Sequence, residues 1–225
     1  MSAIFITATG TDVGKTFVAA SLIRHLRQMG HYVDAIKPIV SGFDPAQAAT
    51  SDPGVLLTAL GRQISPDEIE RTSPWRFRDP VSPDLAARRD GSRIDFAALS
   101  ALCREAIARH RDALIIEGVG GIMVPLDARH TVLDWMIEID LPVLVVVGSY
   151  VGTLSHTLTA LDVLERNDLK VAAVVVSETP ASAAGLEDTA STIRRFVKGI
   201  EVLALPRLPD ASANHPVMAS IADLL

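Results

Sequence analysis

Residues 3–16 read AIFITATGTDVGKT, and this stretch decides the fold of the chain. It begins as a short apolar run of the kind that forms a buried strand, and it ends on Gly-Lys-Thr just before an amphipathic segment. A glycine-containing loop between a strand and a helix N-terminus presents several backbone N–H groups to one phosphate. The usual form of this loop has a glycine where Thr9 stands here, and Gly10 comes one place later. The order of strand, loop and helix still predicts a nucleotide site.

The other apolar residues of the chain also occur in short, nearly continuous runs. Such runs, rich in β-branched residues, are typical of parallel strands that are covered on both faces. Because they alternate with amphipathic segments, they predict an α/β fold with a doubly wound, mostly parallel sheet flanked by helices, of the P-loop nucleotide-hydrolase type. We expect residues 1–225 to form a single P-loop domain. The predicted strands are residues 3–6, 33–36, 113–116, 142–147, 171–176 and 202–205, and the predicted helices are residues 17–29, 96–109, 153–166 and 186–197.

Residues 42–95 differ from the rest of the chain, because they contain six of its 13 prolines. A connection of this length inside a compact domain is usually either functional or disordered. The aromatic residues Trp75 and Phe77 favour an ordered Pro-rich excursion near the active site. We expect no strand within it and a helix at residues 54–60.

The charge and the hydropathy of the chain limit its partners. With 21 Lys and Arg against 27 Asp and Glu, the formal net charge is −6, which argues against nucleic acid and against an anionic membrane as partners. Mean hydropathy is +0.29, but the longest apolar runs are far shorter than the ~20 residues that span a bilayer. The first residues lack the features of a signal peptide and the single cysteine suits a reducing compartment, so we expect a cytoplasmic protein.

Polar side chains at the ends of the predicted strands extend the phosphate site. Lys15 is expected to contact the β- and γ-phosphates, and Thr16 to bind Mg²⁺. Glu117 ends a strand before a glycine-rich turn, and Asp52 offers the metal a second carboxylate; the alternatives are a solvated acid and a helix cap. Lys37 follows the second strand, where it can neutralise charge on a transferring group, although composition alone favours a surface lysine.

Taken together, these motifs resemble those of the dethiobiotin synthetase family, which closes the ureido ring in biotin biosynthesis. The most specific segments are Lys-Pro-x-x-Ser-Gly at residues 37–42 and Glu-Gly-x-Gly-Gly at residues 117–121. Further matching segments are residues 10–16, 51–52, 82–83 and 151–156.

The resemblance implies an ATP-dependent ligase that acts on 7,8-diaminononanoate and on CO₂ or bicarbonate. One amine takes up CO₂ to form a carbamate, and the carbamate attacks the γ-phosphate to give a carbamic–phosphoric anhydride. The second amine then closes the ring, which yields dethiobiotin, ADP and phosphate. The implied cofactors are Mg²⁺ and ATP as co-substrate. A homodimer is also implied, in which residues 152–155 of one subunit hold the substrate carboxylate of the other.

The resemblance also assigns roles to individual residues. It makes Lys37, Lys15 and Thr11 catalytic, and it gives the metal to Thr16, Asp52 and Glu117. The residues expected to bind substrate are Thr11, Lys37, Ser41, Gly152, Thr153, Leu154 and Ser155. The residues expected to bind nucleotide are Asp12, Val13, Gly14, Lys15, Thr16, Phe17, Asp52, Glu117, Gly118, Val119, Gly120, Ser177, Glu178, Pro206, Arg207 and Leu208. The family has Asn where Ser177 stands, and a serine lacks the paired donor and acceptor of an amide, which predicts weak base selectivity.

Two other functions remain open at this point. A nucleotide-dependent switch or partitioning ATPase of the same fold would act through protein contacts; such proteins often carry a second lysine early in the loop, and residues 8–13 contain none. An amidating ligase would need a nucleophilic cysteine, but Cys103 lies in a helix-like stretch that reads as core. Lys37 and Ser41 favour small-molecule chemistry.

Overall fold

The computed structural model describes residues 2–209 and 215–225. Within them, six strands form one sheet in the order β2-β5-β1-β6-β7-β8, and every neighbouring pair is parallel. The predicted doubly wound parallel sheet is therefore confirmed, with strand ends that differ slightly from the predicted ones. The strands are β1 (Ser2–Ala8), β2 (Val33–Ile36), β5 (Ala113–Glu117), β6 (Val143–Gly148), β7 (Val171–Ser177) and β8 (Glu201–Leu205).

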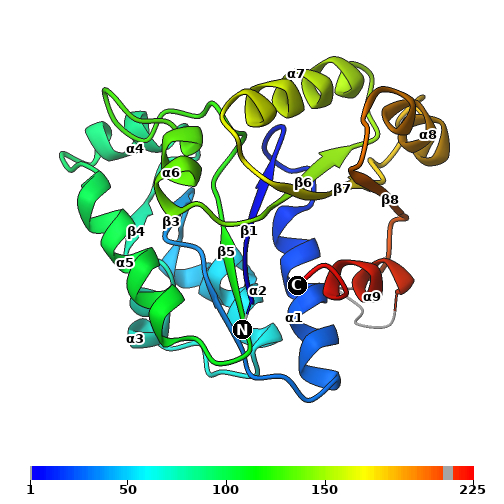
Figure 1. The fold of residues 1–225 in the computed structure, drawn as a ribbon. Coiled ribbons are helices and arrows are strands. Elements are labelled where there is room, and N and C mark those ends of the chain that lie inside the picture. The colour runs from blue at the N-terminus through cyan, green and yellow to red at the C-terminus, as the bar shows by residue number, and fades with distance from the viewer. Residues whose placement is uncertain (1, 210–214) are drawn as a thin grey trace.

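Helices cover both faces of this sheet, with α1 and α9 on one side and α7 on the other (Figure 1). Because successive side chains of a strand point to opposite faces, β1 sends Ile4 and Ile6 into one apolar core and Phe5 into the other. The first core is shared with α1 (Lys15–Gln28), α2 (Asp52–Ala59) and α9 (Pro216–Ala222). The second is shared with α5 (Phe96–Arg109), α6 (Val132–Ile139), α7 (Thr153–Arg166) and α8 (Leu186–Phe196).

The Pro-rich excursion is ordered, but it does contain a strand. Strand β4 (Trp75–Phe77) pairs in parallel with β3 (Ile39–Ser41) in a separate two-stranded sheet, so the expectation of no strand is wrong. Both Ile39 and Phe77 are buried in one apolar core, and such tertiary burial favours extended backbone where local sequence shows no strand pattern. The expected helix at 54–60 is confirmed as α2. The excursion also includes the 3-10 helix η1 (Pro45–Thr50), α3 (Pro66–Thr72) and α4 (Pro83–Arg89).

The strand order decides where a ligand can bind. β1 lies between β5 and β6, so the direction in which the chain builds the sheet reverses beside it. In open α/β sheets the crevice outside the carboxyl ends of the strands at such a point is the usual ligand site. The carboxyl ends of β1, β2 and β5 are followed by the phosphate loop, by Lys37 and by the glycine-rich turn after Glu117.

The positive mean hydropathy of the chain is explained by these buried strands. Cys103 of α5 is fully buried, as its helix-like surroundings predict, and so is Trp135 of α6. In the part of the chain that the structure describes, no helix has the length and apolar character needed to cross a membrane.

Candidate functional site

The phosphate loop runs from the end of β1 to the start of α1. Gly14, directly before the helix, has a φ of 100°, which L side chains rarely adopt. A Cβ atom added there would also lie 2.9 Å from Oγ of Ser177, at the end of β7. Gly14 is therefore required both by backbone conformation and by the close approach of β7.

Lys15, the first residue of α1, is buried beneath the loop. Its Nζ donates a hydrogen bond of 2.9 Å to the carbonyl oxygen of Gly10. Burial, followed by repulsion from Lys37, lowers the pKa of Lys15 to about 8. The loop thus holds its lysine folded back on its own backbone, close to the position from which the residue type contacts phosphate oxygens.

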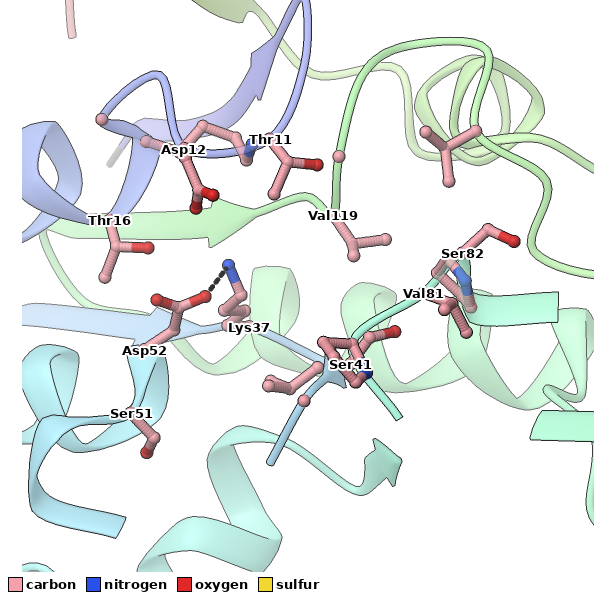
Figure 2. Close-up of a pocket in the computed structure, with 18 of the residues that line it drawn as sticks. Thr11, Asp12, Thr16, Lys37, Ser41, Ser51, Asp52, Val81, Ser82 and Val119 are labelled. Atoms are coloured by element: carbon pink, nitrogen blue, oxygen red, sulfur yellow. Dashed lines mark ion pairs between the residues drawn. The ribbon is translucent and has the colours of Figure 1, made fainter. Parts of the chain in front are cut away.

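Lys37 connects the two carboxylates that were predicted to bind metal. Its Nζ lies 2.7 Å from Oδ2 of Asp52 and 2.5 Å from Oε1 of Glu117. Thr16 Oγ1 donates to the same Glu117 oxygen at 2.6 Å. Figure 2 shows Lys37, Asp52 and Thr16 pointing toward one another below the phosphate loop. The four residues come from distant parts of the sequence and form one polar cluster, in which Lys37 and Glu117 are buried while the Asp52 side chain is 44% exposed.

The charged groups of this cluster shift one another's pKa values. Burial would lower the pKa of Lys37, but Glu117 and Asp52 outweigh it and hold that pKa above its ordinary value. Burial likewise opposes ionisation of Asp52, yet the neighbouring Lys37 and Thr16 lower the pKa of Asp52 below its usual range. Lys37 is therefore a charged ammonium at neutral pH, so the interpretation as a surface lysine is excluded: its side chain is only 4% exposed.

Secondary structure positions each member of the cluster. Lys37 leaves the sheet after β2, and Glu117 is the last residue of the neighbouring β5. Asp52 opens α2, whose N-cap is Ser51 rather than Asp52 itself. The backbone of Lys37 is held from the excursion, because its N–H donates to the Thr72 carbonyl at 3.0 Å. Sequence reasoning missed this support, which depends on a pairing between segments that lie far apart in the chain.

A cleft of about 780 Å³ opens above the cluster. Glu117 and Gly118 lie behind its wall, while Val119 and Gly120 face it. Residues 152–155 do not line it. The predicted site residues that line the cleft are Thr11, Asp12, Gly14, Lys15, Thr16, Phe17, Lys37, Ser41, Asp52, Val119 and Gly120. Lining residues that were not predicted to belong to the site are Val40, Gly42, Thr50, Ser51, Pro80, Val81, Ser82, Pro83 and Val124, of which Val40, Gly42, Ser51, Ser82 and Pro83 stand in matching segments.

A second cleft, of about 440 Å³, lies on the other side of the phosphate loop. It shares Asp12, Gly14 and Phe17 with the first, so one elongated ligand can reach both. Oε2 of Glu178 accepts a hydrogen bond of 2.8 Å from the backbone N–H of Arg207, which ties the two walls together. The predicted residues here are Asp12, Val13, Gly14, Phe17, Ser177, Glu178, Pro206, Arg207 and Leu208, and the unpredicted ones are Arg24, Val55, Thr179, Pro180 and Pro209.

Residues 152–155 form the start of α7, outside both clefts. Thr153 is buried and its hydroxyl donates to the carbonyl of Gly148 at 2.6 Å. Val151, just before them, is 80% exposed. A single chain therefore does not bring this segment to the clefts.

The predicted metal ligands fit a hard divalent cation. Hydroxyl and carboxylate oxygens are the ligands that Mg²⁺ prefers, and Thr16, Asp52 and Glu117 supply them within one cluster. Oε2 of Glu117 is buried and has no hydrogen-bond partner among the described residues, so this oxygen retains capacity for a cation.

Structures of known proteins share the fold. The MinD cell division protein of Aquifex aeolicus superposes with a TM-score of 0.56 at 15% identity, covering 100% of this chain and 95% of that chain. The ParA family ATPase of Chlorobium tepidum gives a TM-score of 0.54 at 14% identity, with coverage of 99% and 96%. At such low identity these likenesses concern the fold alone.

Sequence relatives are much closer. Residues 2–215 match the AAA domain family. The ATP-dependent dethiobiotin synthetase BioD of Acidiphilium cryptum is 46% identical over 198 residues, which cover 88% of this chain and 89% of that protein. The protein of the same name from Caulobacter vibrioides (strain NA1000 / CB15N) is 44% identical over 226 residues, covering 100% and 99%. Because this similarity extends over the loop, the Lys37 segment and the Glu117 segment together, the chain belongs to the family of ATP-dependent dethiobiotin synthetases.

Proposed function

We propose that this protein is an ATP-dependent dethiobiotin synthetase, which converts 7,8-diaminononanoate, CO₂ and ATP to dethiobiotin, ADP and phosphate. The observation that carries the proposal is the position of Lys37. Its ammonium is buried beside the phosphate loop and at the wall of the larger cleft. Nucleotide binding by the loop does not require a second lysine there, so Lys37 indicates chemistry beyond nucleotide binding. Family membership supplies the reaction that such a site performs.

In this proposal the nucleotide extends across the phosphate loop. Its base enters the smaller cleft beside Ser177 and Arg207, and its phosphates contact the loop N–H groups and Lys15. The diamine occupies the larger cleft, near Thr11 and Ser41. In this arrangement the carbamate oxygen faces the γ-phosphate directly, with the Lys37 ammonium beside both groups.

The chemistry needs positioning and charge neutralisation rather than a protein nucleophile. Lys15 and Lys37 stabilise the negative charge that is shared by the γ-phosphate and the carbamate. Mg²⁺, held by Thr16, Asp52 and Glu117, would neutralise further phosphate charge when it is bound. The hydroxyls of Thr11 and Ser41 orient the substrate, and Oγ of Ser41 is buried without a hydrogen-bond partner among the described residues.

We further propose a cytoplasmic homodimer in which residues 152–155 bind the substrate carboxylate in the partner's cleft. Their position at a helix N-terminus suits an anion, and they lie outside the clefts of their own chain. Mixing Lys37→Met with Ser155→Trp subunits tests this arrangement. Each variant alone should be inactive, and the mixture should regain activity, since one of its two sites is intact.

A coupled assay tests the reaction itself. MgATP, bicarbonate and 7,8-diaminononanoate are supplied, and ADP and the ureido product are followed together. ADP release should depend on the diamine and match product formation in a ratio of one to one. If ADP release is indifferent to the diamine, the synthetase proposal fails and the partitioning-ATPase alternative gains support.

A further inference from the structure

The ammonium of Lys37 lies where the three predicted metal ligands converge. It contacts Asp52 at 2.7 Å and the Oε1 atom of Glu117 at 2.5 Å, and Thr16 donates to that same oxygen. In Figure 2 the Lys37 side chain is directed at Asp52, with Thr16 beside them. Oxygen atoms that suit a hard metal cation are thus gathered around the ammonium group of Lys37.

The two carboxylates need a counter-charge. Glu117 is fully buried, so its negative charge requires a partner, and Asp52 adds a second negative charge at the same site although its side chain is 44% exposed. The nearby Lys15 attracts both carboxylates through its charge, but among the described residues it forms no ion pair with either, because its Nζ is turned to the Gly10 carbonyl. Within the described residues, the ion pairs of Asp52 and of Glu117 are both formed with Lys37.

We propose that Lys37 holds the place of the divalent cation in the nucleotide-free protein, and that ammonium and cation compete for Asp52 and Glu117. The proposal deepens the proposed function and rests on its use of a metal–nucleotide complex. A cation that takes over the carboxylates repels the ammonium, which then turns into the larger cleft that it already lines together with Ser41. There the ammonium can donate a hydrogen bond to Oγ of Ser41, which is buried and has no hydrogen-bond partner among the described residues.

As a consequence, binding of the metal–nucleotide complex makes the positive charge of Lys37 available for catalysis. Without metal and nucleotide, Lys37 stabilises the two carboxylates and keeps free divalent cations out. When the metal–nucleotide complex binds, the same positive charge is released toward the substrate. Lys37 therefore acts first as a structural cation and then as a group that touches the reacting atoms.

Binding of Mn²⁺ to the nucleotide-free protein tests the competition without any catalysis. The proteins compared are the wild type, Lys37→Met, Lys37→Gln and the control Lys198→Met, which removes the same charge from an exposed position. Free Mn²⁺ is followed by its electron paramagnetic resonance signal, and folding by circular dichroism. Both Lys37 variants should bind Mn²⁺ at least about tenfold more tightly than the wild type and the control, because they lack the competing ammonium of Lys37.

Thermal unfolding provides the second measurement. Mn²⁺ should raise the Tm of the Lys37 variants markedly more than that of the wild type, since only they lack a cation at the carboxylates. A methionine variant that folds only with Mn²⁺ also supports the proposal. Folded variants that bind Mn²⁺ no more tightly than the wild type overturn it, and so does a glutamine variant that stays unfolded at saturating Mn²⁺.

These outcomes are independent of the reaction. If ADP release proves indifferent to the diamine while the Lys37 variants gain Mn²⁺ affinity, the proposed function fails and the competition stands. If the synthetase assay succeeds while the Lys37 variants show no gain in Mn²⁺ affinity, the proposed function stands and the competition is refuted.

Discussion

Nζ of Lys37 lies 2.5 Å from Oε1 of Glu117, although 80 residues separate the two in the chain. The sheet register explains the contact. Ile36 of β2 pairs with Ile116 of the parallel strand β5, so Lys37, the residue after β2, lies beside Glu117, the last residue of β5. A lysine and a glutamate at these two strand ends are thereby held together at the edge where the phosphate loop also lies.

Replacing Lys37 should impair turnover far more than nucleotide binding. We expect Lys37→Met to lower kcat by at least ~10²-fold without raising the KM for ATP, because one preorganised electrostatic contact is typically worth that much in the transition state. Steady-state kinetics with saturating diamine measure this effect, and Lys198→Met is the matched control. Near-normal turnover of the variant would remove Lys37 from the mechanism.

The enzyme should discriminate only modestly between nucleotide bases. Ser177 offers one hydroxyl to the smaller cleft, and a single hydrogen bond changes binding by only about tenfold. Comparison of kcat/KM for ATP, GTP and CTP checks this expectation. A much stronger preference for ATP would show that backbone groups of the segment 206–208, which Glu178 holds in place, recognise the base.

Adding one methyl group to α2 should destabilise the site. A Cβ atom at Gly54 would lie 2.0 Å from the carbonyl oxygen of Ala48, so α2 and η1 must move apart. We expect Gly54→Ala to lower the free energy of unfolding by about 1–3 kcal/mol and to weaken Mn²⁺ binding, because Asp52 opens the same helix. In Gly10→Ala the new methyl meets no atom within 4 Å, so its urea unfolding should match the wild type. Equal stability of the two variants would contradict this packing argument.

Cys103 should be chemically inert in the folded protein. Burial raises the pKa of its thiol to about 12, from an ordinary value of 9.0. We expect no reaction with Ellman's reagent at pH 8 until urea unfolds the chain. Rapid labelling of the native protein would show that α5 opens readily.

The same pKa shift makes stability depend on pH. Between pH 9 and pH 12 the unfolded chain loses the thiol proton while the folded protein keeps it, so the contribution of Cys103 to stability is fully present below pH 9 and is lost as pH rises. The expected slope is about 1.4 kcal/mol per pH unit above pH 9. Urea unfolding of the wild type and of Cys103→Ala at pH 8, 9 and 10 isolates this term. Parallel pH profiles for the two proteins would contradict it.

Much of the fold follows from local pattern. Five of the six apolar runs could be assigned to strands because each is continuous and ends at a glycine, a proline or a polar residue, whereas residues 33–36 are interrupted by Asp34 and gave a weaker pattern. Strand β4 could not be predicted, since Trp75–Phe77 is short, lies among prolines and becomes extended only through its pairing with β3. The position of residues 152–155 outside the clefts of their own chain agrees with the arrangement that the family resemblance implies, but local pattern alone could not predict it, because it depends on where α7 begins relative to the other strand ends.

The sequence by itself determined the α/β class, the phosphate loop and the residue types of the site, because each depends on neighbours within one short segment. Tertiary structure alone decided what those residues do to one another. Only the packing of β2 beside β5 and of α2 beside α1 brings Lys37, Glu117, Asp52 and Thr16 together. Burial there turns an ordinary lysine into the cation that two carboxylates require, because an unpaired charge is costly where water is excluded.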